Sequence, residues 1–325
     1  MKKKLLAFLL IGVLGTSVLA ACGGNQATSE TASSVSESAE EEPAATPEPT
    51  EEPVEEEPAE EPAAAVDKEL LVVSFGTSYN DSRNVTIGGI ENALREAYPN
   101  FLVRRAFTAQ IIIDKLAERD GIHIDNVTEA LDRAVADGIK TLVVQPTHLM
   151  NGFEYTDLKD ELDAYADSFE SLVLAEPLLT SDEDFTAVAE SLHSEMEQYD
   201  DGKTAIVFMG HGTEAESNSV YGTMQEKFTE LGYNNFYVGT VEAAPTCEDV
   251  LAAIEGKGYE KVVLRAMMVV AGDHANNDMA DPEDPESWYS AFTAEGYDVT
   301  AVLQGLGQIY EVAEIYAEHA EAKMG

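Results

Sequence analysis

The sequence predicts an α/β protein with two similar Rossmann-like lobes, each built on a parallel sheet, and an active-site cleft between them. From Glu69 onward, apolar runs of strand length alternate with amphipathic segments of helix length, as in βα units. Four strand-like runs fall in each half of this region. The plan of the first half then recurs, because "LLVVSFGTSYNDSR" and "AIVFMGHGTEAESN" both lead from an apolar strand through a Gly-Thr turn into a polar helix start.

The expected strands are short apolar runs bounded by Gly, Pro or polar residues. They are expected at 70–75, 101–107, 141–145, 172–175, 205–209, 236–239, 261–268 and 299–303. Segments with helical periodicity lie between them, at 88–97, 127–136, 156–169, 184–198, 221–231, 247–256 and 309–323. Parallel strands end at one edge of a sheet, so we expect the ligand at the edges that face each other across the cleft.

Along the chain, the composition predicts four parts. Residues 1–21 are typical of a lipoprotein signal peptide, and residues 22–67 of a lipid-anchored, disordered linker rich in Glu and Pro. Residues 68–202 are expected to form an N-terminal α/β lobe and residues 203–325 a C-terminal one. Each lobe is below the size at which a single core stops growing.

The N-terminus predicts export and lipid attachment. Three lysines precede an apolar run that is too short to span a membrane, and the sequence Leu-Ala-Ala-Cys ending at Cys22 is typical of lipoprotein processing. We expect lipid on the sulfur of Cys22, which would anchor the protein to the outer face of the cell membrane or in the periplasm. An ordinary signal peptide with a stray cysteine is the alternative.

Charge and cysteine content exclude several classes of function. The formal net charge is −43, and only thirteen Glu and one Asp of the 62 acidic residues lie in 23–67, so the folded part is itself acidic. This argues against nucleic-acid binding and weakly favours a cationic or metal-bearing ligand. Cys22 and Cys247 are the two cysteines, so neither a cysteine metal cluster nor a disulfide framework is expected. A homo-oligomer is compatible with the sequence.

Three histidines, His148, His211 and His274, follow strand-like runs and are expected near one cleft. In the first lobe "FGT" at 75–77 stands where the second has "HGT" at 211–213, so the turn does not require a histidine and His211 is expected to face a ligand. The alternatives are a helix-capping His211 and a core His148. The remaining histidines are expected to be solvated on the surface: His123, His193 and His319.

A carboxylate and a few cations complete the candidate site. Glu176 follows the apolar run "SLVLA", with a helix N-terminal carboxylate as the alternative. Two imidazoles and one carboxylate suit Co, Ni, Fe or Zn and leave coordination positions open. No phosphate-binding loop is present, and Ser74 has no nucleophile-elbow context. Arg83 is the best-placed cation for an acidic ligand, with a helix-surface ion pair as the alternative; the other candidates are Arg104, Arg105 and Arg265.

The segments "LLVVSFGTSYNDSR", "QPTHLMNGFEY", "FMGHGT" and "MMVVAGDHANNDM", followed by "DPESW", resemble the anaerobic cobalt chelatases of the CbiK type, which act on sirohydrochlorin. The resemblance extends from Lys68 to the C-terminus. It implies a two-lobed chelatase fold that inserts Co²⁺ into a tetrapyrrole, sirohydrochlorin or precorrin-2, without ATP, as in cobalamin biosynthesis. It also implies that His148, Glu176 and His211 bind the metal and that His148 accepts a proton.

The resemblance guides two further expectations. The residues expected to contact the tetrapyrrole are His274, Arg83, Ser74 and Thr77. Co²⁺ is the expected metal substrate, with Ni²⁺ or Fe²⁺ as alternatives. The export signal is unexpected for an enzyme of corrinoid synthesis, which is cytoplasmic. The alternative function is therefore a cell-surface lipoprotein that binds a tetrapyrrole such as haem, or a divalent metal, for uptake.

Overall fold

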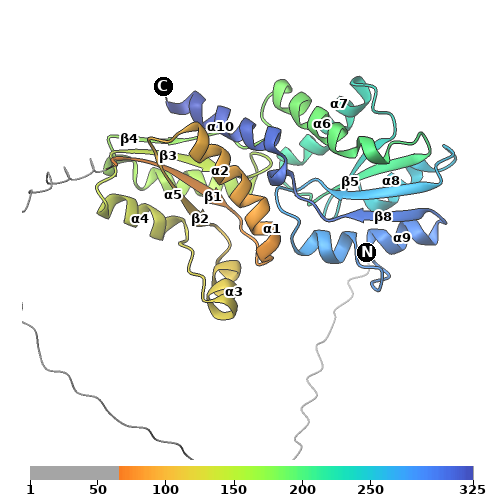
Figure 1. Ribbon diagram of the computed structural model, residues 1–325, viewed down its shortest axis with the longest axis horizontal. Helices are drawn as coiled ribbons and strands as arrows, with labels where there is room; N and C mark the ends of the chain where they lie inside the picture. The colour runs from red at the N-terminus through yellow and green to blue at the C-terminus, as the bar shows by residue number, and fades with distance from the viewer. Residues whose placement is uncertain (1–65, 325) are drawn as a thin grey trace, which may run out of the picture. The chain divides into compact units, whose positions relative to one another are not determined.

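The structure, a computed structural model, describes residues 66–324, and these residues form two four-stranded parallel sheets covered by helices (Figure 1). The predicted signal peptide, the lipid site at Cys22 and the linker up to residue 65 lie outside the described residues. The strands are β1 (Lys68–Ser74), β2 (Leu102–Phe107), β3 (Thr141–Pro146), β4 (Ser171–Leu174), β5 (Thr204–Gly210), β6 (Phe236–Thr240), β7 (Lys261–Ala266) and β8 (Asp298–Val302). All eight predicted strands are present, and the α/β class is confirmed.

The two sheets have the same strand order, β2-β1-β3-β4 and β6-β5-β7-β8. The register is also the same, because Val73 of β1 pairs with Pro146 of β3 as Met209 of β5 pairs with Ala266 of β7. Residues of the inner strands of one lobe, and the first residues after them, therefore have defined counterparts in the other. The inner strands, β1 and β3 or β5 and β7, are buried apolar runs in the middle of each sheet.

The helices include three that the sequence analysis did not predict. They are α1 (Asn80–Val85), α2 (Ile87–Ala97), α3 (Gln110–Asp120), α4 (Val127–Ala136), α5 (Phe153–Asp163), α6 (Asp182–Met196), α7 (Ser219–Glu230), α8 (Cys247–Ile254), α9 (Trp288–Ala294) and α10 (Tyr310–Met324). Of the unpredicted ones, α1 and α9 are short. The third, α3, leaves Ile111 exposed, which obscures its amphipathic pattern. A π-helical turn, Ala275–Met279, was also not predicted.

Two helices cover the sheet of the other half of the chain. Helix α6, from the first half, packs against α7, whereas the C-terminal helix α10 packs against α2 and β3 (Figure 1). The predicted boundary between residues 202 and 203 thus separates the two sheets along the chain but not the helices that cover them. The division into two domains stays a prediction.

One hydrophobic cluster joins the two halves. It contains Leu70 and Val72 of β1, Ile206 and Phe208 of β5, and buried side chains of α6 and α10. Burial of this apolar surface is the main term that holds the lobes together. In the described part of the chain, no helix is both long and apolar enough to cross a membrane.

Candidate functional site

A cavity of about 680 Å³ lies where the carboxyl ends of the inner strands of both sheets meet. Its walls come from the loops after β1, β3, β5 and β7, together with α3 and the start of α5. The lining surface is mainly apolar, and ionisable side chains interrupt it at a few positions. This composition and size suit a large ligand with an apolar body and a reactive polar centre.

Two equivalent turns, after β1 and β5, approach this cavity. Gly76 and Gly212 have φ angles of 99° and 87°, which favour glycine. An added Cβ atom would also lie only 2.5 Å and 2.8 Å, respectively, from neighbouring atoms. The preceding residues, Phe75 and His211, both line the cavity. Because the two turns share a backbone form, the fold does not require the imidazole of His211. That residue lies well before α7 begins and does not cap it.

His148 follows β3 and is buried, and neither of its ring nitrogens has a hydrogen-bond partner among the described residues. Its Nε2 atom lies 3.5 Å from Oε2 of Glu154, in the first turn of α5. Burial lowers the pKa of His148 to about 4, so the ring is neutral at pH 7. Buried polar atoms in proteins normally have partners. A neutral, unpaired imidazole on the cavity wall is therefore suited to accept a proton or to bind a metal.

Glu154 lies close to both halves of the site. Burial raises the pKa of Glu154, and the charge of His211 partly offsets this shift. The carboxylate is thus near His211 as well as His148. It can stabilise a proton or a cation that is held between the two histidines.

The second lobe supplies a group of three potential metal ligands. His211, Glu242 and His274 each offer one donor atom, and these atoms lie within 4.8 Å of one another. Nδ1 of His211 lies 2.7 Å from the carbonyl oxygen of Gly212, and Nδ1 of His274 lies 2.7 Å from Oδ2 of Asp278. A proton on each Nδ1 satisfies these contacts and leaves Nε2 free to bind a metal. Two imidazoles and a carboxylate suit a divalent first-row metal.

Two buried tyrosines hold the loops that carry these groups. The hydroxyl of Tyr316, on α10, lies 3.2 Å from the carbonyl oxygen of Thr147 and 3.3 Å from that of His148. The hydroxyl of Tyr221 accepts a hydrogen bond of 3.2 Å from the backbone nitrogen of Gly212. Both loops are therefore fixed from beneath, which keeps the functional side chains in place before a ligand arrives.

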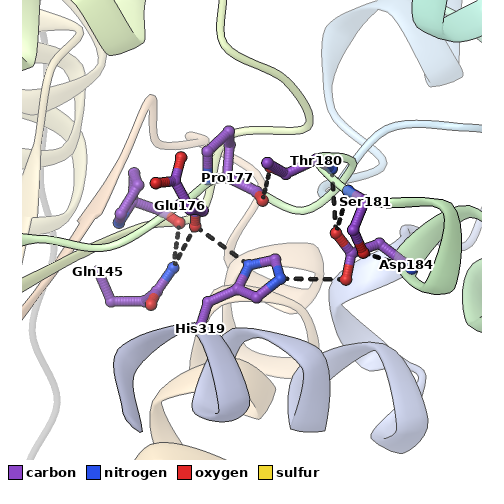
Figure 2. A network of polar contacts seen from close by, with 8 residues as sticks. Gln145, Glu176, Pro177, Thr180, Ser181, Asp184 and His319 are labelled. Atoms are coloured by element: carbon purple, nitrogen blue, oxygen red, sulfur yellow. Dashed lines mark hydrogen bonds and ion pairs between the residues drawn. The ribbon is translucent and has the colours of Figure 1, made fainter. Parts of the chain in front are cut away.

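Glu176 is not among the residues that line the cavity, although its carboxylate lies near Tyr155, which does. Its carboxylate forms an ion pair of 2.8 Å with Lys323. Its carbonyl oxygen accepts a hydrogen bond from Nε2 of Gln145, at 3.1 Å, and lies 3.3 Å from Nδ1 of His319 (Figure 2). The structure therefore does not bring Glu176 together with the predicted histidine ligands. Its role as a metal ligand stays a prediction from the resemblance.

The expectation for the other histidines is met only by His123, which is exposed. The ring of His193 stacks on Tyr233 with 3.9 Å between the centroids. Nε2 of His319 lies 3.1 Å from Oδ1 of Asp184 (Figure 2). His193 and His319 are partly buried and not fully solvated, because both belong to helices whose packing partners lie far away in the sequence.

The structure brings three of the four predicted substrate residues to the cavity: Ser74, Thr77 and His274. Arg83 lies elsewhere. It is buried, and its guanidinium donates a hydrogen bond of 2.8 Å to Oδ1 of Asn80. The other arginines considered pair with carboxylates, Arg104 with Glu69 and Asp137, Arg105 with Glu91, and Arg265 with Glu195.

Sequence reasoning missed three residues at or beside the cavity. Glu154 lies in the same motif as His148, six residues later, and attention to a second polar group in that motif would have found it. Glu242 follows β6, so the rule that identified Glu176 after β4 applies equally to it. Lys115 lies on α3, a helix that was not predicted.

Comparisons with known proteins identify the family of this chain. The profile of the cobalt chelatase (CbiK) family matches residues 68–324. The sirohydrochlorin cobaltochelatase of Salmonella typhimurium is 36% identical over 252 residues, which cover 78% of this chain and 94% of that protein. The sirohydrochlorin cobaltochelatase CbiKC of Nitratidesulfovibrio vulgaris is 30% identical over 257 residues, covering 78% and 90%.

Solved structures share the fold. SirB from Bacillus subtilis with Fe³⁺ has a TM-score of 0.58 at 12% identity, covering 79% of this chain and 95% of SirB. CbiX, described as the terminal enzyme of sirohaem biosynthesis in denitrifying bacteria, has a TM-score of 0.50 at 17% identity, covering 79% and 100%. At such identities the similarity concerns the fold alone.

Proposed function

Because the chain belongs to the cobalt chelatase (CbiK) family, we propose that it inserts Co²⁺ into sirohydrochlorin without ATP. The observation that carries this proposal is the set of groups that meet in the apolar cavity between the strand ends. A neutral, unpaired imidazole from the first lobe faces the same space as two histidines from the second lobe, which stand beside a carboxylate. Metal insertion requires both kinds of group, a base for the ring protons and ligands that deliver the metal.

The metal is held by His211, His274 and Glu242 in this proposal. Their donor atoms are already within 4.8 Å of one another, and both histidines have their Nδ1 atoms engaged. Three protein ligands leave positions open for the ring nitrogens that replace them. A closed set of four ligands would hold the ion too tightly for transfer. In this proposal His148 accepts protons and is not a fourth ligand, which differs from the set of His148, Glu176 and His211 that the resemblance implies.

The protons are removed by His148 with the help of Glu154. Insertion releases two pyrrole N–H protons, and the free Nε2 atom of His148 accepts them in turn, passing the first to Glu154 before it takes the second. Protonation makes the buried ring cationic, and the carboxylate of Glu154, 3.5 Å away, stabilises that charge. The approaching divalent ion favours the same step, because it makes the pyrrole nitrogens more acidic.

The test is incubation of the purified protein with sirohydrochlorin and Co²⁺, followed by absorbance of the metallated product. We expect many turnovers per protein molecule without ATP. Ni²⁺ and Fe²⁺, assayed in parallel, identify the preferred metal, which we propose to be Co²⁺. Absence of any rate above the uncatalysed insertion would refute the proposal.

The N-terminal sequence favours a second candidate function, capture of a tetrapyrrole or metal at the cell surface. We propose that the mature chain starts at Cys22 and is held by lipid, since the lysine-rich start and apolar run are typical of export. Stoichiometric retention of haem or metal without turnover would favour capture over chelation. Membrane fractionation of Cys22→Ser tests the anchor, and a variant that still sediments with membranes would contradict it.

A further inference from the structure

Helix α3 presents one face to the cavity and the opposite face to the core. Ile111, Ile112 and Lys115 line the cavity, and the spacing from 111 to 115 places these side chains on one side of the helix. Ile113 and Leu116 are buried against Ile87 and Phe107. The cavity face of α3 is thus a strip with an apolar part and a cationic part.

The apolar part of this strip is exposed to solvent, which is unfavourable for side chains of this kind. Ile111 is 74% exposed, and two other exposed large apolar side chains, Phe75 and Phe153, line the same cavity. They come from three different segments, the loop after β1, α3 and the first residue of α5. Apolar groups gathered at the edge of a cavity indicate that a ligand covers them.

Lys115 stands apart among the charged groups. Most described lysines and arginines pair with a carboxylate, as expected in a chain with net charge −43. Lys115 and Lys159 have neither an ion pair, a hydrogen bond nor an aromatic contact within residues 66–324. Only Lys115 lines the cavity, where the acidic groups are Glu154 and Asp273. An unpaired ammonium in so acidic a molecule indicates an anionic partner.

We propose that α3 orients the tetrapyrrole in the cavity, with Lys115 paired to one of its peripheral carboxylates and Ile111 packed on the macrocycle. The identity of the ligand rests on the proposed function. The imidazoles gather at the strand ends, whereas the cation and the isoleucines stand on a separate helix. A disc bound with one peripheral carboxylate at Lys115 therefore extends its centre toward the histidines.

The experiment measures binding of metal-free sirohydrochlorin by absorbance or fluorescence, with no metal present. We expect Lys115→Gln to raise Kd about tenfold, the effect of one charge-assisted hydrogen bond, and Lys115→Arg to stay near the wild type. The loss should shrink at high ionic strength, because salt screens the pair. In turnover assays Lys115→Gln should raise KM for the tetrapyrrole and leave KM for Co²⁺ unchanged. Ile111→Ser should also weaken tetrapyrrole binding.

Matched controls are available elsewhere on the surface. Lys159→Gln on α5 and Val135→Ser on α4 change an exposed lysine and an exposed apolar residue outside the cavity, and both should bind like the wild type. Chelation with unchanged tetrapyrrole affinity in Lys115→Gln would overturn this inference alone. Binding that depends on Lys115 without metal insertion would support it while the proposed function failed. A wild type that binds no tetrapyrrole would overturn both.

Discussion

The two lobes have the same strand order and register but differ in chemistry at equivalent positions around the cavity. Phe75 of the first lobe corresponds to His211 of the second, and His148 corresponds to Met268. Each pair therefore places a histidine opposite an apolar residue on the same backbone frame. Since one lobe folds without the histidine that the other contains, these imidazoles are not required by the fold. Their placement serves a ligand that approaches both lobes from between them.

From the comparison of the lobes, we expect the largest effect for His211→Phe. This change places at the turn after β5 the residue that the turn after β1 has, Phe75. We expect Co²⁺ affinity to fall at least about 100-fold, because the change removes one of three ligands. The melting temperature should change little, because Phe75 occupies an equivalent turn. Calorimetric titration with Co²⁺ and thermal unfolding check the two parts. A large loss of stability would show that the two turns are not equivalent.

A pH effect distinguishes His148 from its apolar counterpart Met268. The pKa of folded His148 is about 4, below the ordinary value of 6.5, so between these values the unfolded chain binds more protons. The free energy of unfolding should therefore fall, by about 2 kcal/mol, as pH decreases from 6.5 to 4. Urea denaturation of His148→Gln should show a smaller decrease, whereas the exposed His123→Gln should follow the wild type. If the free energy of unfolding decreased equally in all three proteins as the pH is lowered, the prediction would be contradicted.

The two carboxylates that follow edge strands provide a sharper comparison. Glu242→Gln should lower Co²⁺ affinity about tenfold, because a neutral amide is a weaker ligand than a carboxylate. Glu176→Gln should leave Co²⁺ affinity unchanged, since its carboxylate pairs with Lys323 and does not belong to the group of His211, Glu242 and His274. The same titration applied to both variants decides between them. The reverse result would restore Glu176 as the metal ligand and exclude Glu242.

The smallest effects are expected for the tyrosines beneath the two loops. Tyr316→Phe and Tyr221→Phe should each reduce the free energy of unfolding by about 1 kcal/mol, because each removes a buried hydrogen-bonded hydroxyl. Urea denaturation measures this loss. Tyr316→Phe should also slow chelation through the loop of His148, and an unchanged rate would show that this hydrogen bond does not position the base.

Much of the fold could be predicted because its determinants are local. Each strand is an apolar run, and the repeated Gly-Thr turn marks the same place in both lobes. Helix α3 was not predicted because its isoleucines face a cavity as well as the core. Its apolar residues therefore do not form a single face with helical periodicity. The exchange of α6 and α10 between lobes depends on contacts between residues distant in sequence, which no local pattern records.

Contacts between residues distant in sequence also explain why the two carboxylates, Glu176 and Glu242, could not be distinguished from the sequence. Glu176 and Glu242 both follow an edge strand, so their positions in sequence look alike. What separates them is α10, whose Lys323 and His319 contact Glu176. That helix begins more than a hundred residues after Glu176. His148, His211 and His274 could be placed at the cavity from sequence because they follow inner strands of the sheets.

Because α10 packs on the first lobe, the parts of the site must fold in a set order as the ribosome makes the chain. The loop of His148 leaves the ribosome long before Tyr316, on which its position depends. The three proposed metal ligands of the second lobe are also made before that helix, while α6, which covers their sheet, is made earlier still. A nascent chain can therefore assemble the metal-ligating loops first. The loop of His148, the proposed base, gains its contact with Tyr316 only after the first half of α10 has been made, so a chain that ends before Tyr316 lacks this support.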